Sequence, residues 1–246
     1  MIELRVVAES DFGAASLAAF LESLEGLESP AVGLATGNTP VALYAALRQA
    51  VVAGQASVAH IRPFAIDEYG GPRDHPCSNR AFFREHWEST PSARPVAQFD
   101  PDVPDRHTEA RRFGHLVAAA GGLDVAVLGL GFNGHLAFNE PGAEKGGTAA
   151  AVRLTATTIE RSQPCWGAAA PDWGLTLGLS ELLGARRVLL LANGAHKAHI
   201  LRAALRGPMS PECPASWLQE HAGVVVVADE AAGAADRSRG PQWPLA

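Results

Sequence analysis

The densest group of residues suited to chemistry follows the apolar run Leu123–Leu130. Glycines there alternate with polar side chains, and the positions of interest are Gly131, Asn133, Gly134, His135 and Glu140. Glycines let the backbone approach a ligand closely or adopt a positive φ. A histidine with a nearby glutamate is a proton-transfer pair, in which the carboxylate fixes the imidazole tautomer and raises its basicity. The alternative, a core histidine beside a surface glutamate, explains this concentration of polar groups less well.

Two carboxylates and a tyrosine close a second apolar run. Pro63–Ile66 is followed by Asp67, Glu68 and Tyr69. Open α/β sheets bind ligands at the carboxyl ends of their strands. A carboxylate partly removed from water at such a place suits the role of general base, because burial raises its pKa toward neutral pH. The alternative is an acidic pair that caps a helix or forms salt bridges, and the sequence favours neither.

A glycine turn follows a third apolar run, Ala31–Ala35. Its residues are Thr36, Gly37, Asn38 and Thr39, with Pro40 next. We expect Thr39 at the N-cap of a helix and Pro40 at its first position. Free backbone N–H groups and the helix dipole make such a junction an anion site, most naturally for phosphate. It matches neither a dinucleotide fingerprint nor a Walker A loop, and an ordinary strand-to-helix turn is the alternative.

A lysine stands at the start of another predicted helix. The chain has only two lysines, Lys145 and Lys197, and Lys197 closes the segment Asn193–Lys197 after an apolar run. A cation in the first turn is electrostatically misplaced, since the helix N-terminus is already positive. This placement favours an anion between the lysine and the helix over a lysine that merely extends into solvent.

Composition excludes several classes of protein. The chain has 246 residues and a formal net charge of −6, and this acidic balance argues against general nucleic-acid binding. No apolar run approaches the roughly 20 residues of a membrane helix, and residues 1–8 do not resemble a signal peptide. We therefore expect a cytoplasmic protein with neither a nucleic-acid nor a membrane partner. Histidines, cysteines and carboxylates do not cluster at metal-ligand spacing, so we expect no metal. The sequence also lacks the G-x-S-x-G elbow of a serine hydrolase.

The three cysteines are odd in number and far apart in sequence. They are Cys77, Cys165 and Cys213, without a C-x-x-C spacing. Reduced thiols in a cytosolic enzyme are the expectation, rather than a disulfide framework.

The elements that would position these residues alternate along the chain. Apolar runs predict strands near residues 2–7, 31–35, 63–66, 123–130, 187–192 and 223–228. Helical patterns cover residues 9–24, 40–52, 79–88, 105–120 and 196–205. This alternation predicts an α/β fold with a single doubly wound, mostly parallel sheet and helices on both faces, a Rossmann-like three-layer sandwich.

No break in composition forces a domain boundary, so residues 1–246 are predicted to form one domain. The stretch 142–151, rich in glycine and alanine, is expected to be a mobile loop. Residues 233–246 lack apolar periodicity and are expected to form a weakly held tail.

The motifs resemble one known family. The Thr-Gly-x-Thr-Pro turn, the Asp-Glu-Tyr strand end and the Gly-x-Asn-Gly-His-x-x-Phe-Asn-Glu-Pro segment are similar to those of the glucosamine/galactosamine-6-phosphate deaminases (isomerases). That family is related in fold to the 6-phosphogluconolactonases, whose Gly-His continues without Phe-Asn-Glu-Pro. The resemblance runs from about Ala31 to about Ala228. Residues 121–136, 175–179 and 214–216 are more similar to the galactosamine branch, which slightly favours galactosamine 6-phosphate as substrate.

The resemblance implies a reaction without metal or nucleotide cofactor. Residues 36–39 and Lys197 would hold the phosphate with Arg161, the best match to the family's phosphate-binding arginine. His135 would open the sugar ring, and Asp67 would move the C2 proton to C1. Glu140 would orient His135 and tune its charge, because Asn133 cannot carry charge. Water would then release ammonia and leave a ketose 6-phosphate.

Two other functions are weighed against a hexosamine 6-phosphate deaminase. A 6-phosphogluconolactonase would be indifferent to loss of the Glu140 carboxylate. A non-catalytic sugar-phosphate sensor of the kind found in transcriptional regulators would carry an added DNA-binding helix-turn-helix, for which a first strand near Ile2 leaves no room. The sequence leaves a homo-oligomer open.

Overall fold

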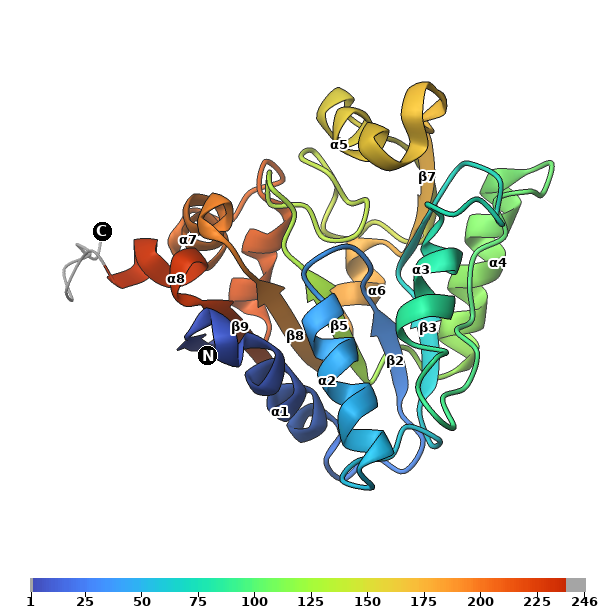
Figure 1. The fold of residues 1–246 in the computed structure, drawn as a ribbon. Helices are drawn as coiled ribbons and strands as arrows, with labels where there is room; N and C mark the ends of the chain where they lie inside the picture. The colour runs from blue at the N-terminus through green and yellow to red at the C-terminus, as the bar shows by residue number, and fades with distance from the viewer. Residues whose placement is uncertain (1, 238–246) are drawn as a thin grey trace.

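Six parallel strands form the central sheet of the computed structural model, which describes residues 2–237 (Figure 1). The strands are β1 (Glu3–Val7), β2 (Ala31–Leu34), β3 (Arg62–Ala65), β5 (Val125–Gly129), β8 (Arg187–Ala192) and β9 (Val224–Asp229). They lie in the order β1-β9-β8-β5-β2-β3, and every neighbouring pair is parallel. The predicted mostly parallel α/β sheet is confirmed.

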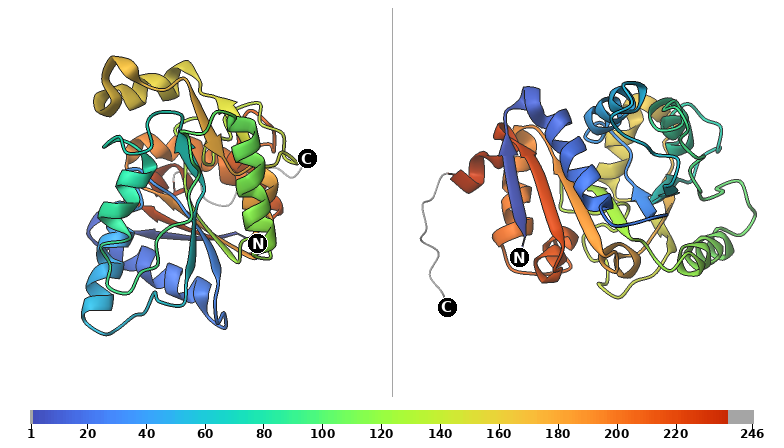
Figure 2. Two further views of the ribbon diagram at one scale, coloured as in Figure 1. Left: turned by 90° about the vertical axis from the view of Figure 1, so that its right-hand side faces the viewer. Right: turned by 90° about the horizontal axis from the view of Figure 1, so that it is seen from below.

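Helices cover both faces of this sheet (Figure 2). The apolar side chains of α1 (Phe12–Leu24), α2 (Val41–Val52) and α3 (Asn79–His86) share one core with Val125 and Val127. Those of α4 (Arg106–Ala119), α6 (Leu179–Leu183) and α7 (Ala198–Arg206) share the other core with Ala126 and Leu128. Successive residues of β5 thus enter opposite cores, as a strand buried on both faces requires. No helix within residues 2–237 is long and apolar enough to cross a membrane.

A second, smaller sheet was not predicted. It consists of β4 (Asp67–Tyr69), β7 (Trp173–Thr176) and β6 (Ala150–Arg153), paired antiparallel in the order β4-β7-β6. The prediction of a single sheet missed it because its strands do not stand out as apolar runs: β4 is DEY, β6 is AAVR in an alanine-rich stretch, and β7 is WGLT. The predicted loop 142–151 therefore ends in β6, and α5 (Ala156–Trp166) follows and lies above the sheets (Figure 1).

Short 3₁₀ helices complete the chain: Glu9–Asp11, Gly167–Ala169, Ala195–Lys197 and Pro214–Glu220. The last described element is α8 (Glu230–Arg237), which includes residues 233–237 of the expected tail, and the weak attachment of that tail stays a prediction. Asp229 stabilises the start of this helix, because its Oδ1 accepts the backbone N–H of Ala232 at 2.7 Å. Gly233 packs so closely on Val6 that a larger side chain would collide. Residues 238–246 lie outside the described residues.

A disulfide joins Cys77 to Cys165, so the expectation of reduced thiols is wrong for these two residues. They are 88 positions apart, but α5 folds back over the loop that precedes α3 and brings their Cα atoms to 5.8 Å. The spacing of the cysteines in the sequence could not predict this contact, because the contact depends on where the second sheet places α5. Cys213 is a free thiol, as expected.

Candidate active site

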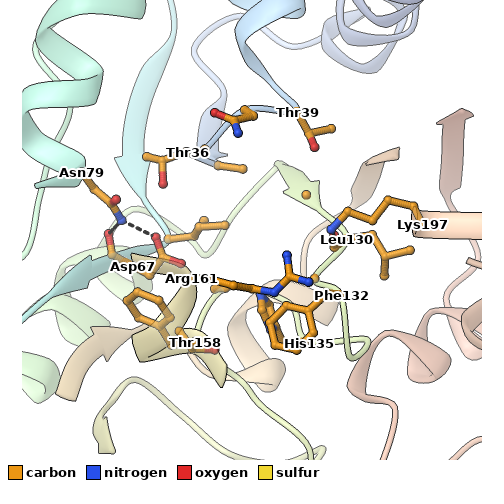
Figure 3. Close-up of a pocket in the computed structure, with 18 of the residues that line it drawn as sticks. Thr36, Thr39, Asp67, Asn79, Leu130, Phe132, His135, Thr158, Arg161 and Lys197 are labelled. Carbon is orange, nitrogen blue, oxygen red and sulfur yellow. Dashed lines mark hydrogen bonds between the residues drawn. The ribbon is translucent and has the colours of Figure 1, made fainter. Parts of the chain in front are cut away.

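A pocket of about 460 Å³ opens at the carboxyl ends of the parallel strands (Figure 3). Its lining includes nine of the residues singled out from sequence: Thr36, Gly37, Asn38, Thr39, Asp67, Gly131, His135, Arg161 and Lys197. Most of these residues meet here because their segments follow parallel strands at the same edge of the sheet, whereas Arg161 reaches the pocket from α5 (Ala156–Trp166), after the second sheet. Asn133, Gly134 and Glu140 do not line this pocket themselves.

The glycine turn after β2 forms one wall. Gly37 has a φ of +90°, a conformation that favours glycine. The N-cap of α2 is Pro40, so the expectation that Thr39 would cap the helix is wrong. The Thr39 hydroxyl instead donates to Asn193 Oδ1 at 2.9 Å, because the turn extends one residue further before the helix begins. This bond ties the turn after β2 to the loop after β8.

Asp67 and Glu68, adjacent in β4, have different surroundings. Asp67 lines the pocket, and its Oδ1 accepts a 2.6 Å hydrogen bond from Asn79 Nδ2. Glu68 points to the start of α3, where its two carboxylate oxygens accept the backbone N–H groups of Asn79 and Arg80 at 2.8 and 2.9 Å. The capping alternative is therefore correct for Glu68. Asp67 faces the pocket, and its role as a general base stays a prediction.

The acidity of Asp67 is set by its burial. Burial and, to a lesser extent, the neighbouring Glu68 raise the pKa of Asp67 to about 7, against the opposing effect of the Asn79 donor. Burial also raises the pKa of Glu68 to about 7, against the N–H groups that it accepts. Asp67 can therefore exchange a proton near neutral pH, which is the property required of a general base.

His135 is held by the glycine loop after β5. Its ring packs so closely against Gly131 that a larger side chain at that position would collide with it. Burial lowers the pKa of His135 to about 4, with Glu140 opposing and Lys197 and Arg161 adding to the effect. The imidazole is therefore neutral at pH 7. Its Nδ1 is buried without a hydrogen-bond partner among the described residues.

Glu140 does not orient the His135 ring through a hydrogen bond, contrary to the expectation from sequence. Its carboxylate accepts from Asn133 Nδ2 at 3.3 Å and from the backbone N–H and hydroxyl of Thr155 at 3.2 and 2.6 Å. Burial raises the pKa of Glu140, but the bonds from Thr155 and Thr158 and the proximity of His135 outweigh it, so the pKa lies below its usual value. Glu140 is thus ionised and acts on His135 through its charge.

Asn133 connects this carboxylate to the histidine loop. While its Nδ2 donates to Glu140, its Oδ1 accepts the backbone N–H of His135 at 3.2 Å. The neutral Asn133 amide therefore links Glu140 to the His135 backbone but contributes no charge. Gly134, with a φ of +85°, completes the turn, and its carbonyl accepts from the backbone of Ala215 at 2.8 Å.

Two cationic side chains, those of Arg161 and Lys197, reach the pocket from different elements (Figure 3). The Arg161 guanidinium, from α5, lies 4.3 Å from the centroid of the Phe132 ring. Lys197 precedes α7, and its Nζ donates to the Leu130 carbonyl at 2.6 Å. Burial, with a smaller contribution from Arg161, lowers the pKa of Lys197 to about 8. Two cations and the glycine turn before α2 make this end of the pocket suited to a phosphate.

Several residues of the site were not predicted from the sequence. Asn79, Thr158 and Phe132 line the pocket, and Thr155 holds Glu140. Ser78-Asn79 at the start of a predicted helix was the one available signal for Asn79, but it indicates only a cap. Nothing in the sequence indicated Thr155, because β6 and α5 were not predicted.

The fold and the pocket define an α/β protein with acid–base groups and an anion site at the carboxyl edge of its parallel sheet. Residues 10–227 match the family model described as glucosamine-6-phosphate isomerases/6-phosphogluconolactonase. The chain belongs to this family.

Curated relatives and solved structures agree with this assignment. A glucosamine-6-phosphate deaminase of Rhodopirellula baltica is 36% identical over 238 residues, which cover 94% of this chain and 95% of the relative. Glucosamine-6-phosphate deaminase 2 of Bacillus subtilis is 33% identical, with 87% and 89% covered. The structure of a monomeric glucosamine-6-phosphate deaminase superposes with a TM-score of 0.90 at 27% identity, over 95% of this chain and 99% of that one. A Trypanosoma brucei 6-phosphogluconolactonase has the same fold, with a TM-score of 0.75 at 23% identity over 95% and 98% of the two chains.

Proposed function

We propose that this chain converts a hexosamine 6-phosphate to a ketose 6-phosphate and ammonia. The observation that carries the proposal is the position of a buried carboxylate with a pKa near 7, Asp67, in one pocket with the cations Arg161 and Lys197. The carboxylate suits proton transfer next to a carbonyl carbon, and the cations suit the phosphate of the same substrate. The names of the curated relatives support the same reaction.

In this proposal the phosphate occupies the end of the pocket formed by residues 36–39, Arg161 and Lys197. The sugar then extends toward Asp67 and His135. Neutral His135 carries one N–H and one free lone pair, so it takes the proton of the anomeric hydroxyl and returns one to the ring oxygen, which opens the ring. Fixing the phosphate at one end holds the reacting carbons in place at the other.

Asp67 carries out the isomerisation. Its carboxylate removes the C2 proton of the open amino aldehyde, which gives an enolamine, and returns that proton to C1. The product is an imine at C2, and water hydrolyses it to the ketone and ammonia. Glu140 stays ionised and stabilises positive charge that develops on His135 during these transfers. The net reaction breaks a C–N bond with consumption of water, so we class the enzyme as a hydrolase acting on C–N bonds.

The first substrate to assay is glucosamine 6-phosphate, because the curated relatives carry that name. The preference for galactosamine 6-phosphate that the sequence suggested stays a prediction. The test measures ammonia and ketose 6-phosphate from both epimers side by side with the purified chain. Ammonia from one epimer supports the proposal and identifies the substrate. Hydrolysis of 6-phosphogluconolactone without ammonia from either epimer would instead identify a lactonase.

The location we propose is the cytoplasm, because phosphorylated hexosamines are substrates of metabolism inside cells. Fractionation of the producing cells, followed by detection of the chain with an antibody, tests this part. Recovery with the cytosolic fraction is the expected result.

A further inference from the structure

Asn79 is a buried amide that contacts the proposed base directly. It begins α3 and lines the pocket beside Asp67 (Figure 3). Its Nδ2 donates to the Asp67 backbone carbonyl at 3.0 Å and to Asp67 Oδ1 at 2.6 Å. The carbonyl and the ionised carboxylate of Asp67 can only accept hydrogen bonds, so the nitrogen of the Asn79 amide must face Asp67. These two bonds use both N–H groups of that nitrogen.

The start of α3 is itself fixed. Ser78 caps the helix, since its Oγ accepts the backbone N–H of Ala81 at 3.1 Å. Glu68 accepts the backbone N–H groups of Asn79 and Arg80 at 2.8 and 2.9 Å. Asn79 thus cannot move away from Asp67 without breaking bonds that are mostly buried. Oδ2 of Asp67 accepts no hydrogen bond from the described residues and is left for a substrate proton.

We infer that Asn79 is a positioning residue, which fixes Asp67 and keeps its carboxylate ionised so that Oδ2 can accept the C2 proton. The inference rests on the proposed function. Glu68 and Tyr69 on β4 and Arg80 on α3 are the titratable groups around this pair, and the amide opposes the effect that burial and Glu68 have on the acidity of Asp67. Without the amide, Asp67 would be protonated over more of the neutral range.

The test replaces Asn79 by Leu, which has a similar size but no donor. We expect kcat to fall roughly 10- to 100-fold, as for a lost hydrogen bond to a charged group, and the acidic limb of kcat/KM to move to higher pH. Asn79→Asp should move that limb in the same direction, because it places a second carboxylate at Asp67. Glu85→Gln, a change at an exposed residue of the same helix, is the matched control.

A direct titration separates this inference from the proposed function. The ¹³C resonance of the Asp67 carboxyl, assigned by its loss in Asp67→Asn, reports the pKa without any turnover. A higher pKa of Asp67 in folded Asn79→Leu or Asn79→Asp supports the inference even if no hexosamine phosphate is deaminated. An unchanged Asp67 titration in a folded variant would overturn it.

The Cys77–Cys165 disulfide is an independent observation about the same pocket. It ties the last turn of α5 to the loop directly before Ser78 and Asn79. Arg161 and Cys165 are four residues apart in α5 and so lie on the same face of the helix. Cys165 is exposed and Cys77 is half-buried, so the bond is accessible to small thiols. The same end of α5 is otherwise held by Trp166, whose ring stacks on His75 with centroids 4.1 Å apart.

We propose that this disulfide is a redox switch that holds α5, and with it Arg161, over the pocket. Cytosolic disulfides are usually transient, and the substrate of the proposed function is a cytosolic metabolite. In the oxidising direction the two thiols lose two protons and two electrons to a small disulfide such as oxidised glutathione, which becomes two thiols. A small dithiol reverses the exchange and is itself oxidised to a disulfide.

The test compares oxidised chain with chain reduced by dithiothreitol. We expect reduction to raise KM by about tenfold with a smaller change in kcat, because Arg161 binds the phosphate in both ground and transition states. Cys77→Ser/Cys165→Ser should match the reduced form and ignore the reductant, while Cys213→Ser should respond like the parent. Hydrogen exchange over residues 156–166, faster after reduction, tests the switch without any substrate.

Two results would overturn the proposal. One is the absence of a Cys77–Cys165 cross-linked peptide after treatment with oxidised glutathione and proteolysis without reductant. The other is equal hydrogen exchange over α5 in the oxidised chain, the reduced chain and the double serine variant. Neither result depends on whether the chain deaminates hexosamine phosphates.

Discussion

The hydroxyl of Thr155 donates a 2.6 Å hydrogen bond to Glu140, and this bond joins the N-terminal end of α5 to the loop of His135. The same hydroxyl accepts the backbone N–H of Thr158, so Thr155 is also the N-cap of the helix. Two turns further along, α5 carries Arg161 into the pocket. One helix therefore connects the carboxylate that influences His135 with a cation placed for the substrate phosphate.

Thr155→Val should weaken both functions of this contact. Loss of the hydroxyl removes a donor that lowers the pKa of Glu140, so this pKa should rise, and loss of the cap should destabilise the fold by about 1 kcal/mol. We expect a lower kcat and a higher KM. Thr155→Ser, which keeps the hydroxyl, should retain most of the activity and stability. Steady-state kinetics and thermal unfolding of both variants test this, and equal behaviour of Val and Ser would contradict it.

Arg161→Ala should mainly affect substrate binding. A charge-assisted hydrogen bond to phosphate contributes about 1.5–3 kcal/mol, so KM should rise roughly 10- to 100-fold with little change in kcat. Arg161→Lys keeps the charge but loses the planar guanidinium that fits a phosphate, so its KM should lie between those of the parent chain and Arg161→Ala. Initial rates over a range of substrate concentrations separate KM from kcat. A loss confined to kcat would assign Arg161 to the chemical step instead.

Substrate binding should weaken as the pH rises through about 8. Burial, with Arg161 adding to it, lowers the pKa of Lys197 to about 8, so the free enzyme loses this positive charge above that pH. A bound phosphate favours the charged form, so the basic limb should appear in kcat/KM and not in kcat. Arg161→Ala should move this limb to higher pH. Profiles of both constants between pH 6 and about 9.5 test this, and a flat basic side of kcat/KM would contradict it.

Asp67→Asn should stabilise the fold at pH 8 while abolishing turnover. The folded-state pKa of Asp67, about 7, lies above the ordinary value of 3.8, so the folded state binds this proton more tightly than the unfolded chain. Its contribution to stability is present at low pH and is lost as the pH rises from about 4 to about 7. The variant should exceed the parent by roughly 1–4 kcal/mol at pH 8. Urea unfolding at pH 8 and pH 5 tests this, with a smaller difference at pH 5 as the decisive feature.

Much of the site was predictable because it follows the strands of the parallel sheet. Asp67, His135 and Lys197 each come shortly after a recognisable apolar run, and the carboxyl ends of parallel strands meet at one edge. The types of these side chains and their places in the order of elements were enough to predict a phosphate site with an acid–base group. Such predictions need only the local pattern of the sequence, namely an apolar run followed by polar or charged side chains.

The missed features depend on contacts between distant short elements. The Asn79 bond to Asp67 exists because Glu68 holds the start of α3, and the Thr155 bond to Glu140 exists because β6 places α5 there. The disulfide of Cys77 and Cys165 follows from the same arrangement. The strands of the second sheet do not form apolar runs like those of the central sheet, so neither this sheet nor these contacts could be predicted from the chain.

The most direct test of the central claim is the initial rate of ammonia release from glucosamine 6-phosphate, with galactosamine 6-phosphate in parallel, by the parent chain and by Asp67→Asn. The proposed mechanism predicts ammonia and ketose 6-phosphate in equal amounts from the parent on at least one epimer. It predicts loss of both products in the variant, which should still bind the sugar phosphate. No ammonia from either epimer, or undiminished release by Asp67→Asn, would contradict the account.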